Sequence, residues 1–124
     1  MPEIFGAKAN VFLNYDNNIN ALAARLNKGL IVDIWVENRE QPPYEPTGMG
    51  EALGMELWLN SSDAIPGYTY TLELRTGVCL EEDMNGQMHD LSLWLARFIT
   101  KICDIETLVL CDGDKVVFKV SNKI

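Results

Sequence analysis

Residues 68–76, YTYTLELRT, alternate apolar and polar side chains more strictly than any other part of the chain. Successive side chains of a β-strand point to opposite faces of its sheet, so this period of two predicts a strand with one buried face. The apolar positions are Tyr68, Tyr70, Leu72 and Leu74. This segment constrains the fold most, because the rest of the chain must cover these four side chains.

A second strand is expected just before this one. In residues 55–60, MELWLN, the side chains of Met55, Leu57 and Leu59 share one face. The residues that follow, SSDAIPG, are typical of a turn. The short connection predicts a β-hairpin between the two strands.

The N-terminal part of the chain predicts a strand, a helix and another strand. Residues 9–15 alternate as a strand, and residues 30–37 do so with three β-branched side chains toward the core. Between them, residues 18–29 carry apolar side chains at helical spacing. Capping oxygens precede this segment, and Gly29 is expected to end the helix.

The C-terminal part predicts a second helix and a closing hairpin. Residues 91–103, LSLWLARFITKIC, form an amphipathic helix that Asp90 can cap, and we expect it to be the central core helix. Its apolar face consists of Leu91, Trp94, Leu95, Phe98, Ile99 and Ile102. Asp112 and Gly113 form a hairpin-turn signal between the last two strands.

These elements follow the order β-α-β-β-β-α-β-β. Strands joined mostly as hairpins predict an α+β fold with a largely antiparallel sheet and two helices. The chain has 124 residues of ordinary globular composition. Residues 1–124 therefore make a single domain, which can bury a core without a metal or disulfide.

Catalytic and cofactor motifs are missing from the sequence. The chain has one histidine, His89, and GMGEALG at residues 48–54 lacks the spacing of a dinucleotide-binding fingerprint. Two alternatives stay open: Cys79 with His89 as a nucleophile–base pair, and residues 81–83 with His89 as a metal site. We favour a solvated loop over both. The prediction is a protein that is not an enzyme, with no catalytic residue, no cofactor and no metal.

Cysteine usage indicates the compartment. Cys79, Cys103 and Cys111 are odd in number and lie in apolar surroundings, which is typical of free thiols in a reducing cytoplasm. The first residues, MPEIFGAKANVF, lack the pattern of a signal peptide. No apolar run approaches the ~18 residues that span a membrane. We expect a cytoplasmic protein.

Acidic side chains are concentrated in the middle of the chain. The net charge is −8, and residues 33–90 hold 12 acids against two bases, Arg39 and Arg75. An acidic field repels nucleic acid and anionic membranes, and it attracts cationic partners. The alternative is that the charge serves only solubility.

Two tryptophans fall on strand faces that are otherwise polar. Trp35 and Trp58 alternate with good apolar positions, so each would point away from the core. If partly exposed beside carboxylates, they have the make-up of a protein-binding hot spot. If the segment of residues 37–54 packs over them, they are buried. The sequence leaves both readings open.

The chain resembles the small immunity proteins of bacterial polymorphic-toxin and contact-dependent growth inhibition systems. The residues that carry this resemblance are IWVENREQPPYEPTGMGEALGMELWL, then YTYTLELRTG, and the helix DLSLWLARFITKI with its closing hairpin. The resemblance implies a cytoplasmic protein that binds a cognate toxin domain, often a basic nuclease. It would block the active site of the toxin or its docking to substrate.

Charge and aromatic content select a candidate partner-binding surface. A stiff, proline-rich segment places carboxylates around residues 42–46, PPYEP, and such a segment loses little entropy on docking. The candidate residues are Glu37, Glu40, Tyr44, Glu45, Glu51, Glu56 and Trp58, with Glu81, Glu82 and Asp83 as a second acidic edge. Two alternatives are a small enzyme or ligand-binding domain with a pocket under the second helix, and a homodimeric structural subunit.

Overall fold

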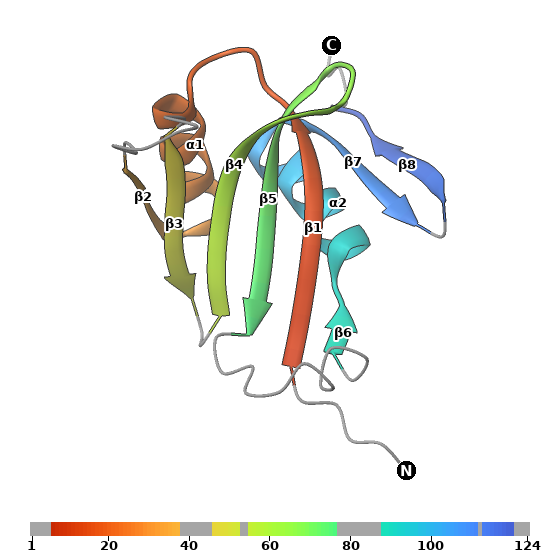
Figure 1. Ribbon diagram of the computed structural model, residues 1–124, viewed down its shortest axis with the longest axis horizontal. Coiled ribbons are helices and arrows are strands. Elements are labelled where there is room, and N and C mark those ends of the chain that lie inside the picture. The colour runs from red at the N-terminus through yellow and green to blue at the C-terminus, as the bar shows by residue number, and fades with distance from the viewer. Residues whose placement is uncertain (1–5, 38–45, 53–54, 77–87, 112, 121–124) are drawn as a thin grey trace.

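The computed structural model describes residues 6–37, 46–52, 55–76, 88–111 and 113–120. Within these residues the chain forms two layers, a single β-sheet and two helices that lie on the same face of it (Figure 1). In chain order the elements are β1 (Gly6–Asn14), α1 (Ile19–Leu30), β2 (Asp33–Glu37), β3 (Thr47–Ala52), β4 (Met55–Ile65), β5 (Tyr68–Thr76), β6 (Met88–Asp90), α2 (Ser92–Cys103), β7 (Glu106–Cys111) and β8 (Asp114–Phe118).

The sheet is largely antiparallel. In the described parts of the chain, its strands are hydrogen-bonded in the order β2-β3-β4-β5-β1-β7-β8, and β6 pairs parallel with the first residues of β1. The central strand β1 pairs with β5 along one edge and with β6 and β7 along the other. The predicted α+β class and the order of the predicted elements are confirmed, including the hairpins β4–β5 and β7–β8.

Two further strands, β3 and β6, lie in segments without a clear strand pattern. In β3, Gly48 and Gly50 face the core. A β-carbon on Gly48 would lie 2.9 Å from Cβ of Leu59, and one on Gly50 would lie 2.7 Å from the main-chain oxygen of Asp33. Glycine is therefore what lets this strand pack between its neighbours. The segment GMG belongs to the sheet and not to a phosphate-binding loop.

The helix layer covers the sheet in two halves. α1 contacts β2, β3 and β4, and α2 contacts β1, β7 and β8. Both helices lie behind the sheet in Figure 1. The Asn18 side chain caps α1 by accepting the Ala21 N–H at 2.9 Å. The helix predicted from apolar side chains at helical spacing is confirmed, and the apolar side chains that it buries are Ile19, Leu22, Ala23 and Leu26.

The prediction that α1 ends at Gly29 is wrong. The helix continues through Leu30, and Ile31 adopts the left-handed conformation with φ of 55°. Gly29 lies against α2 instead, because a β-carbon there would be 2.4 Å from Sγ of Cys103. Glycine at this position serves the close contact between the two helices.

The prediction that Trp94, Phe98 and Ile102 belong to the core is also wrong. These side chains are 60%, 37% and 47% exposed, and the rings of Trp94 and Phe98 stack with centroids 5.6 Å apart. The buried face of α2 is narrower than predicted and mixes apolar with small or polar side chains. Its buried residues are Ser92, Leu95, Ala96, Ile99, Thr100 and Cys103. The apolar face of α2 is wider than the surface that the sheet and α1 can cover.

Neither described helix is long and apolar enough to cross a membrane.

Candidate partner-binding face

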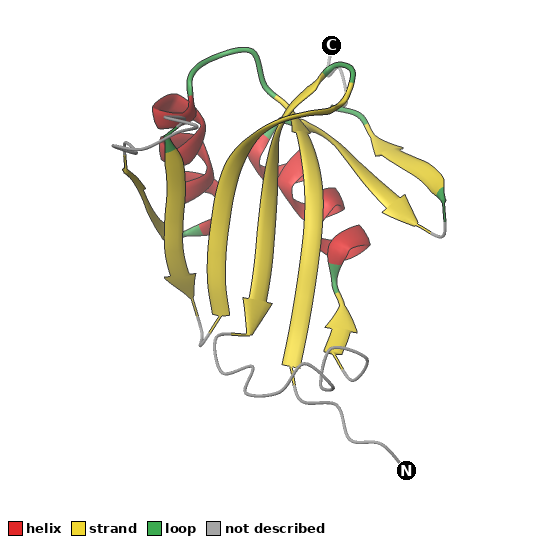
Figure 2. Ribbon diagram, viewed as in Figure 1, coloured by secondary structure: helices red, strands yellow, loops and turns green. Residues whose placement is uncertain are grey.

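The face of the sheet opposite the helices carries a row of large side chains from three strands. Paired Cα positions join Trp35 on β2 to Met49 on β3, and Met49 to Trp58 on β4. Trp35 is 46% exposed and Trp58 is 38% exposed, with Met49 half-buried between them. We call these three residues the tryptophan row. Figure 2 shows this face turned to the viewer, with both helices behind the sheet.

These exposures decide between the two readings of the tryptophans. Residues 47–52 do not pack over Trp35 and Trp58, because they form β3 and lie in the sheet between β2 and β4. Both indoles therefore remain accessible on the face that the helices leave open.

A second row on the same face is acidic. Two residues along each strand, paired Cα positions place Asp33, Glu51 and Glu56 side by side across β2, β3 and β4. We call these three residues the carboxylate row. Along the sheet the same row continues to Arg75 on β5 and Lys8 on β1. The outward positions of β2, β3 and β4 themselves hold no lysine or arginine within the described residues, so this end of the face is the acidic one.

A fourth carboxylate, that of Glu37, is hydrogen-bonded to the indole of Trp35. The Trp35 Nε1–H donates a hydrogen bond to Oε1 of Glu37 at 3.2 Å. This contact satisfies the only polar group of the indole and restrains the ring on the face. Between the tryptophan row and the carboxylate row lies a hollow of about 170 Å³, lined by Trp35, Met49, Gly50, Glu51, Glu56, Leu57 and Trp58.

The structure brings together four residues of the predicted surface: Glu37, Glu51, Glu56 and Trp58. Six others lie outside the described residues: Glu40, Tyr44, Glu45, Glu81, Glu82 and Asp83. The predicted surface omitted three residues that the fold places on this face: Asp33, Trp35 and Met49. Strand alternation in residues 30–37 already pointed to the first two, but Met49 depends on β3, which the sequence did not reveal.

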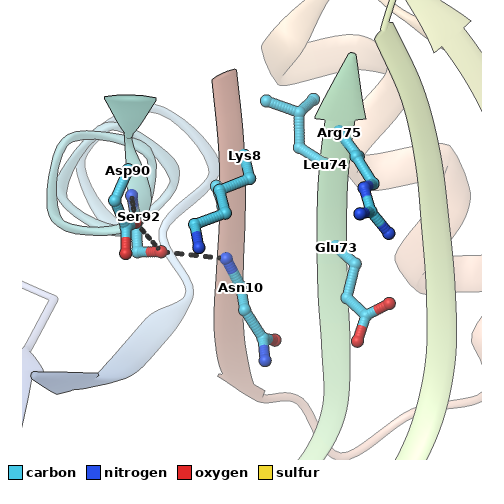
Figure 3. Close-up of a pocket in the computed structure, with 8 residues that line it drawn as sticks. Lys8, Asn10, Glu73, Leu74, Arg75, Asp90 and Ser92 are labelled. Carbon is cyan, nitrogen blue, oxygen red and sulfur yellow. Dashed lines mark hydrogen bonds between the residues drawn. The ribbon is translucent and has the colours of Figure 1, made fainter. Parts of the chain in front are cut away.

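A second hollow, of about 440 Å³, lies where β1, β5 and the start of α2 meet (Figure 3). Oδ1 of Asp90 accepts hydrogen bonds from the Ser92 amide at 2.9 Å and from the Ser92 hydroxyl at 2.5 Å. Oγ of Ser92 in turn accepts the main-chain N–H of Asn10 at 2.9 Å. Leu91 occupies the cap position of α2 without a side-chain cap, so Asp90 supports the helix start from one residue earlier.

The hydrogen bonds among Asn10, Asp90 and Ser92 indicate a structural role and not a catalytic one. The hydrogen bond from Ser92 lowers the pKa of the Asp90 carboxyl against the opposing effect of burial. A carboxylate with a lowered pKa is a weak proton acceptor, so it is poorly suited to activate the Ser92 hydroxyl as a nucleophile. The contacts instead tie α2 to β1.

The described thiols do not suggest nucleophilic chemistry. Cys103 and Cys111 are free, and burial raises the pKa of the Cys103 thiol, which keeps it protonated and weakly nucleophilic. The described residues contain no group of three or more side chains placed to hold a metal ion. The pairing of Cys79 with His89 falls on side chains outside the described residues.

The fold and this face define an α+β protein with an open, acidic, tryptophan-bearing sheet surface. Comparisons of the chain with protein-family models, with curated proteins and with solved structures found no match.

Proposed function

We propose that this protein binds a basic partner protein through the open face of β2, β3 and β4. In this proposal it acts as a cytoplasmic immunity protein, which neutralises a toxin domain by covering its active site or its substrate-docking surface. The observation that carries the proposal is the tryptophan row lying directly beside the carboxylate row on a face that no described helix covers.

The two rows would contribute different parts of the binding free energy. Partly exposed tryptophans supply large apolar contact areas, and hot spots of protein interfaces are enriched in this residue. The carboxylates would steer a positively charged partner during encounter and suppress unsuitable partners. A nuclease toxin presents lysines and arginines to nucleic-acid phosphates, so an acidic face complements the surface that such a toxin needs for its activity.

The first test is protection of growing cells. If the gene beside this one encodes a large secreted protein with a variable terminal domain, that domain is the partner to express. Cells that make the domain should stop growing, and co-expression of this protein should restore growth. Failure to restore growth, with both proteins present and soluble, would contradict the immunity role.

The face is tested by a matched pair of tryptophan variants. Trp58→Ala removes an indole from the tryptophan row, and Trp94→Ala removes a more exposed indole from α2 on the other side of the molecule. Hot-spot truncations cost about 2 kcal/mol or more, so Trp58→Ala should weaken toxin binding about 30-fold by calorimetry. Trp94→Ala should leave the affinity nearly unchanged. Equal losses for both variants would rule out this face as the interface.

The charge is tested at Glu51, which is exposed and belongs to the carboxylate row. Glu51→Lys should lower the association rate and flatten its dependence on salt, because charges at an interface rim act mainly during encounter. The sequence also predicts that Glu40→Lys with Glu45→Lys weakens binding at least tenfold.

Sedimentation of the parent protein alone checks the alternative of a homodimer. If the protein is a dimer and Trp58→Ala dissociates it, the open face binds a second copy of this chain.

A further inference from the structure

The hollow between the two rows is small and has walls of two kinds. Trp35 and Trp58 stand two strands apart, about 10 Å at the usual strand spacing, with Met49 between them. Glu51 and Glu56 line the opposite side. The side chain of Leu57 is buried and Gly50 has none, so these two residues line the hollow with main-chain atoms. Its volume of about 170 Å³ is well below that of pockets for whole small-molecule ligands and suits one side-chain head group.

The chemistry of these walls selects a cation. Indole faces attract positive charge through the quadrupole of the ring, and carboxylates attract it directly. An apolar group entering the hollow would strip water from Glu51 and Glu56 without replacing its hydrogen bonds, which is unfavourable. An anionic group would be repelled by the whole carboxylate row.

Among cationic side chains the walls favour arginine over lysine. A guanidinium group is planar, so it can lie against an indole while its edge donates to carboxylate oxygens. It is also more weakly hydrated than an ammonium group and loses less on leaving water. The Trp35 N–H is already bonded to Glu37, so an incoming group need not satisfy it.

We infer that this hollow is a receptor for one arginine side chain of the partner protein, held between the tryptophan row and the carboxylate row. The identity of the partner rests on the proposed function, but the chemistry of the hollow can be measured without any partner. The ligand class is a monosubstituted guanidinium ion, and its neutral isostere is the urea group of citrulline.

The experiment is a titration of the isotope-labelled protein with N-acetyl-arginine amide, followed by nuclear magnetic resonance of the three indole N–H signals. The signals of Trp35 and Trp58 should shift and saturate, while Trp94, exposed on α2, serves as the internal control. N-acetyl-citrulline amide should bind at least tenfold more weakly, and N-acetyl-lysine amide at least threefold more weakly. Shifts of equal size with the citrulline compound, or at Trp94, would overturn the inference, and tighter binding of the lysine compound would overturn the choice of arginine.

Variants locate the site. Glu51→Gln should weaken binding of the arginine compound at least threefold, and Trp58→Leu should abolish saturation. The matched controls are Asp63→Asn, which removes an exposed carboxylate that does not line the hollow, and Trp94→Leu; both should bind as the parent does. Unchanged binding in Glu51→Gln and Trp58→Leu would place the arginine elsewhere and refute the receptor.

The outcomes separate this inference from the proposed function. If toxin binding depends on Trp58 but the arginine compound leaves the indoles unshifted, the face docks a partner without an arginine receptor. If the arginine compound binds as expected but Trp58→Ala leaves toxin binding intact, the receptor stands and the docking assignment fails.

Discussion

The contact between the two helices gives the sharpest prediction about stability. Gly29→Ala should lower the free energy of unfolding of the parent protein, but it should not lower that of a Cys103→Ala variant. Gly29 lies inside α1, where alanine is normally favoured over glycine by up to about 1 kcal/mol. At this position, however, the new β-carbon would be 2.4 Å from Sγ of Cys103. No such contact is tolerated, so either the cysteine or the helix must move.

The structure sets the size of the penalty. Cys103 is only 3% exposed, so its sulfur can move away from the new β-carbon only by rotating against neighbouring side chains or toward the hollow that Gly29 and Cys103 both line. Overpacking of a well-packed core typically costs about 1–3 kcal/mol, which exceeds the gain in helix propensity. We expect Gly29→Ala to lower the free energy of unfolding by up to about 2 kcal/mol, which is the overpacking cost less the propensity gain.

Removing the sulfur should reverse the effect. In a Cys103→Ala background the closest remaining side-chain neighbours are Cγ2 of Ile102 at 3.4 Å and the Cβ of residue 103 at 3.6 Å, which are ordinary contacts. Gly29→Ala should then be neutral or stabilising. The coupling free energy between the two substitutions should be about 1–3 kcal/mol, in the range seen for residues in direct contact.

The assay is urea unfolding of the parent, the two single variants and the double variant, followed by far-ultraviolet circular dichroism with a reducing agent present. Fitting all four curves with similar m-values keeps the comparison within a two-state description. If Gly29→Ala is at least as stable as the parent, or if it costs the same in both backgrounds, the close packing of α1 on α2 at this point is refuted.

Three further predictions concern pH, a buried polar contact and the thiols. Burial and the hydrogen bond to Glu106 raise the pKa of Tyr68 to about 12, whereas the unfolded chain loses this proton near pH 10. The free energy of unfolding should therefore fall as the pH rises from about 10 to 12, and Tyr68→Phe should flatten this fall; equal slopes would contradict the assignment. Ser92→Ala leaves the Asn10 N–H without its acceptor and should cost about 1–3 kcal/mol in urea unfolding, against less than about 0.5 kcal/mol for a control at an exposed serine such as Ser61. The denatured protein should titrate three free thiols without reductant, and a single thiol would reveal a disulfide.

Part of the candidate site could be predicted from the sequence. Alternation in residues 30–37 and 55–60 assigns Glu37, Glu56 and Trp58 to outward faces, and the structure agrees. Alternation is a property of one strand, because the side-chain direction follows from the backbone of that strand alone. The acidic residues within 37–56 also indicated an acidic surface, because the charge of a segment is read directly from its composition.

Other features depended on which segments meet in space. The tryptophan row requires Trp35 and Trp58 to lie at the same level on two strands with β3 between them, and a strand pattern does not state its register or its neighbours. The register arises from burial of the opposite faces against the helices, with Gly48 and Gly50 leaving room for Ile34 and Leu59.

The two helices also combine features that the sequence predicts with features that depend on tertiary contacts. Helical periodicity in the sequence determined that α1 and α2 form and where their apolar faces lie. It could not determine how much of each face would be covered, because that depends on the width of the sheet and on the position of the other helix. Trp94 and Phe98 remain exposed because α2 meets the sheet through Leu95, Ala96 and Ile99, and Gly29 became a contact point because α1 approaches Cys103 closely. Periodicity is local to one element, whereas coverage and close approach exist only between elements.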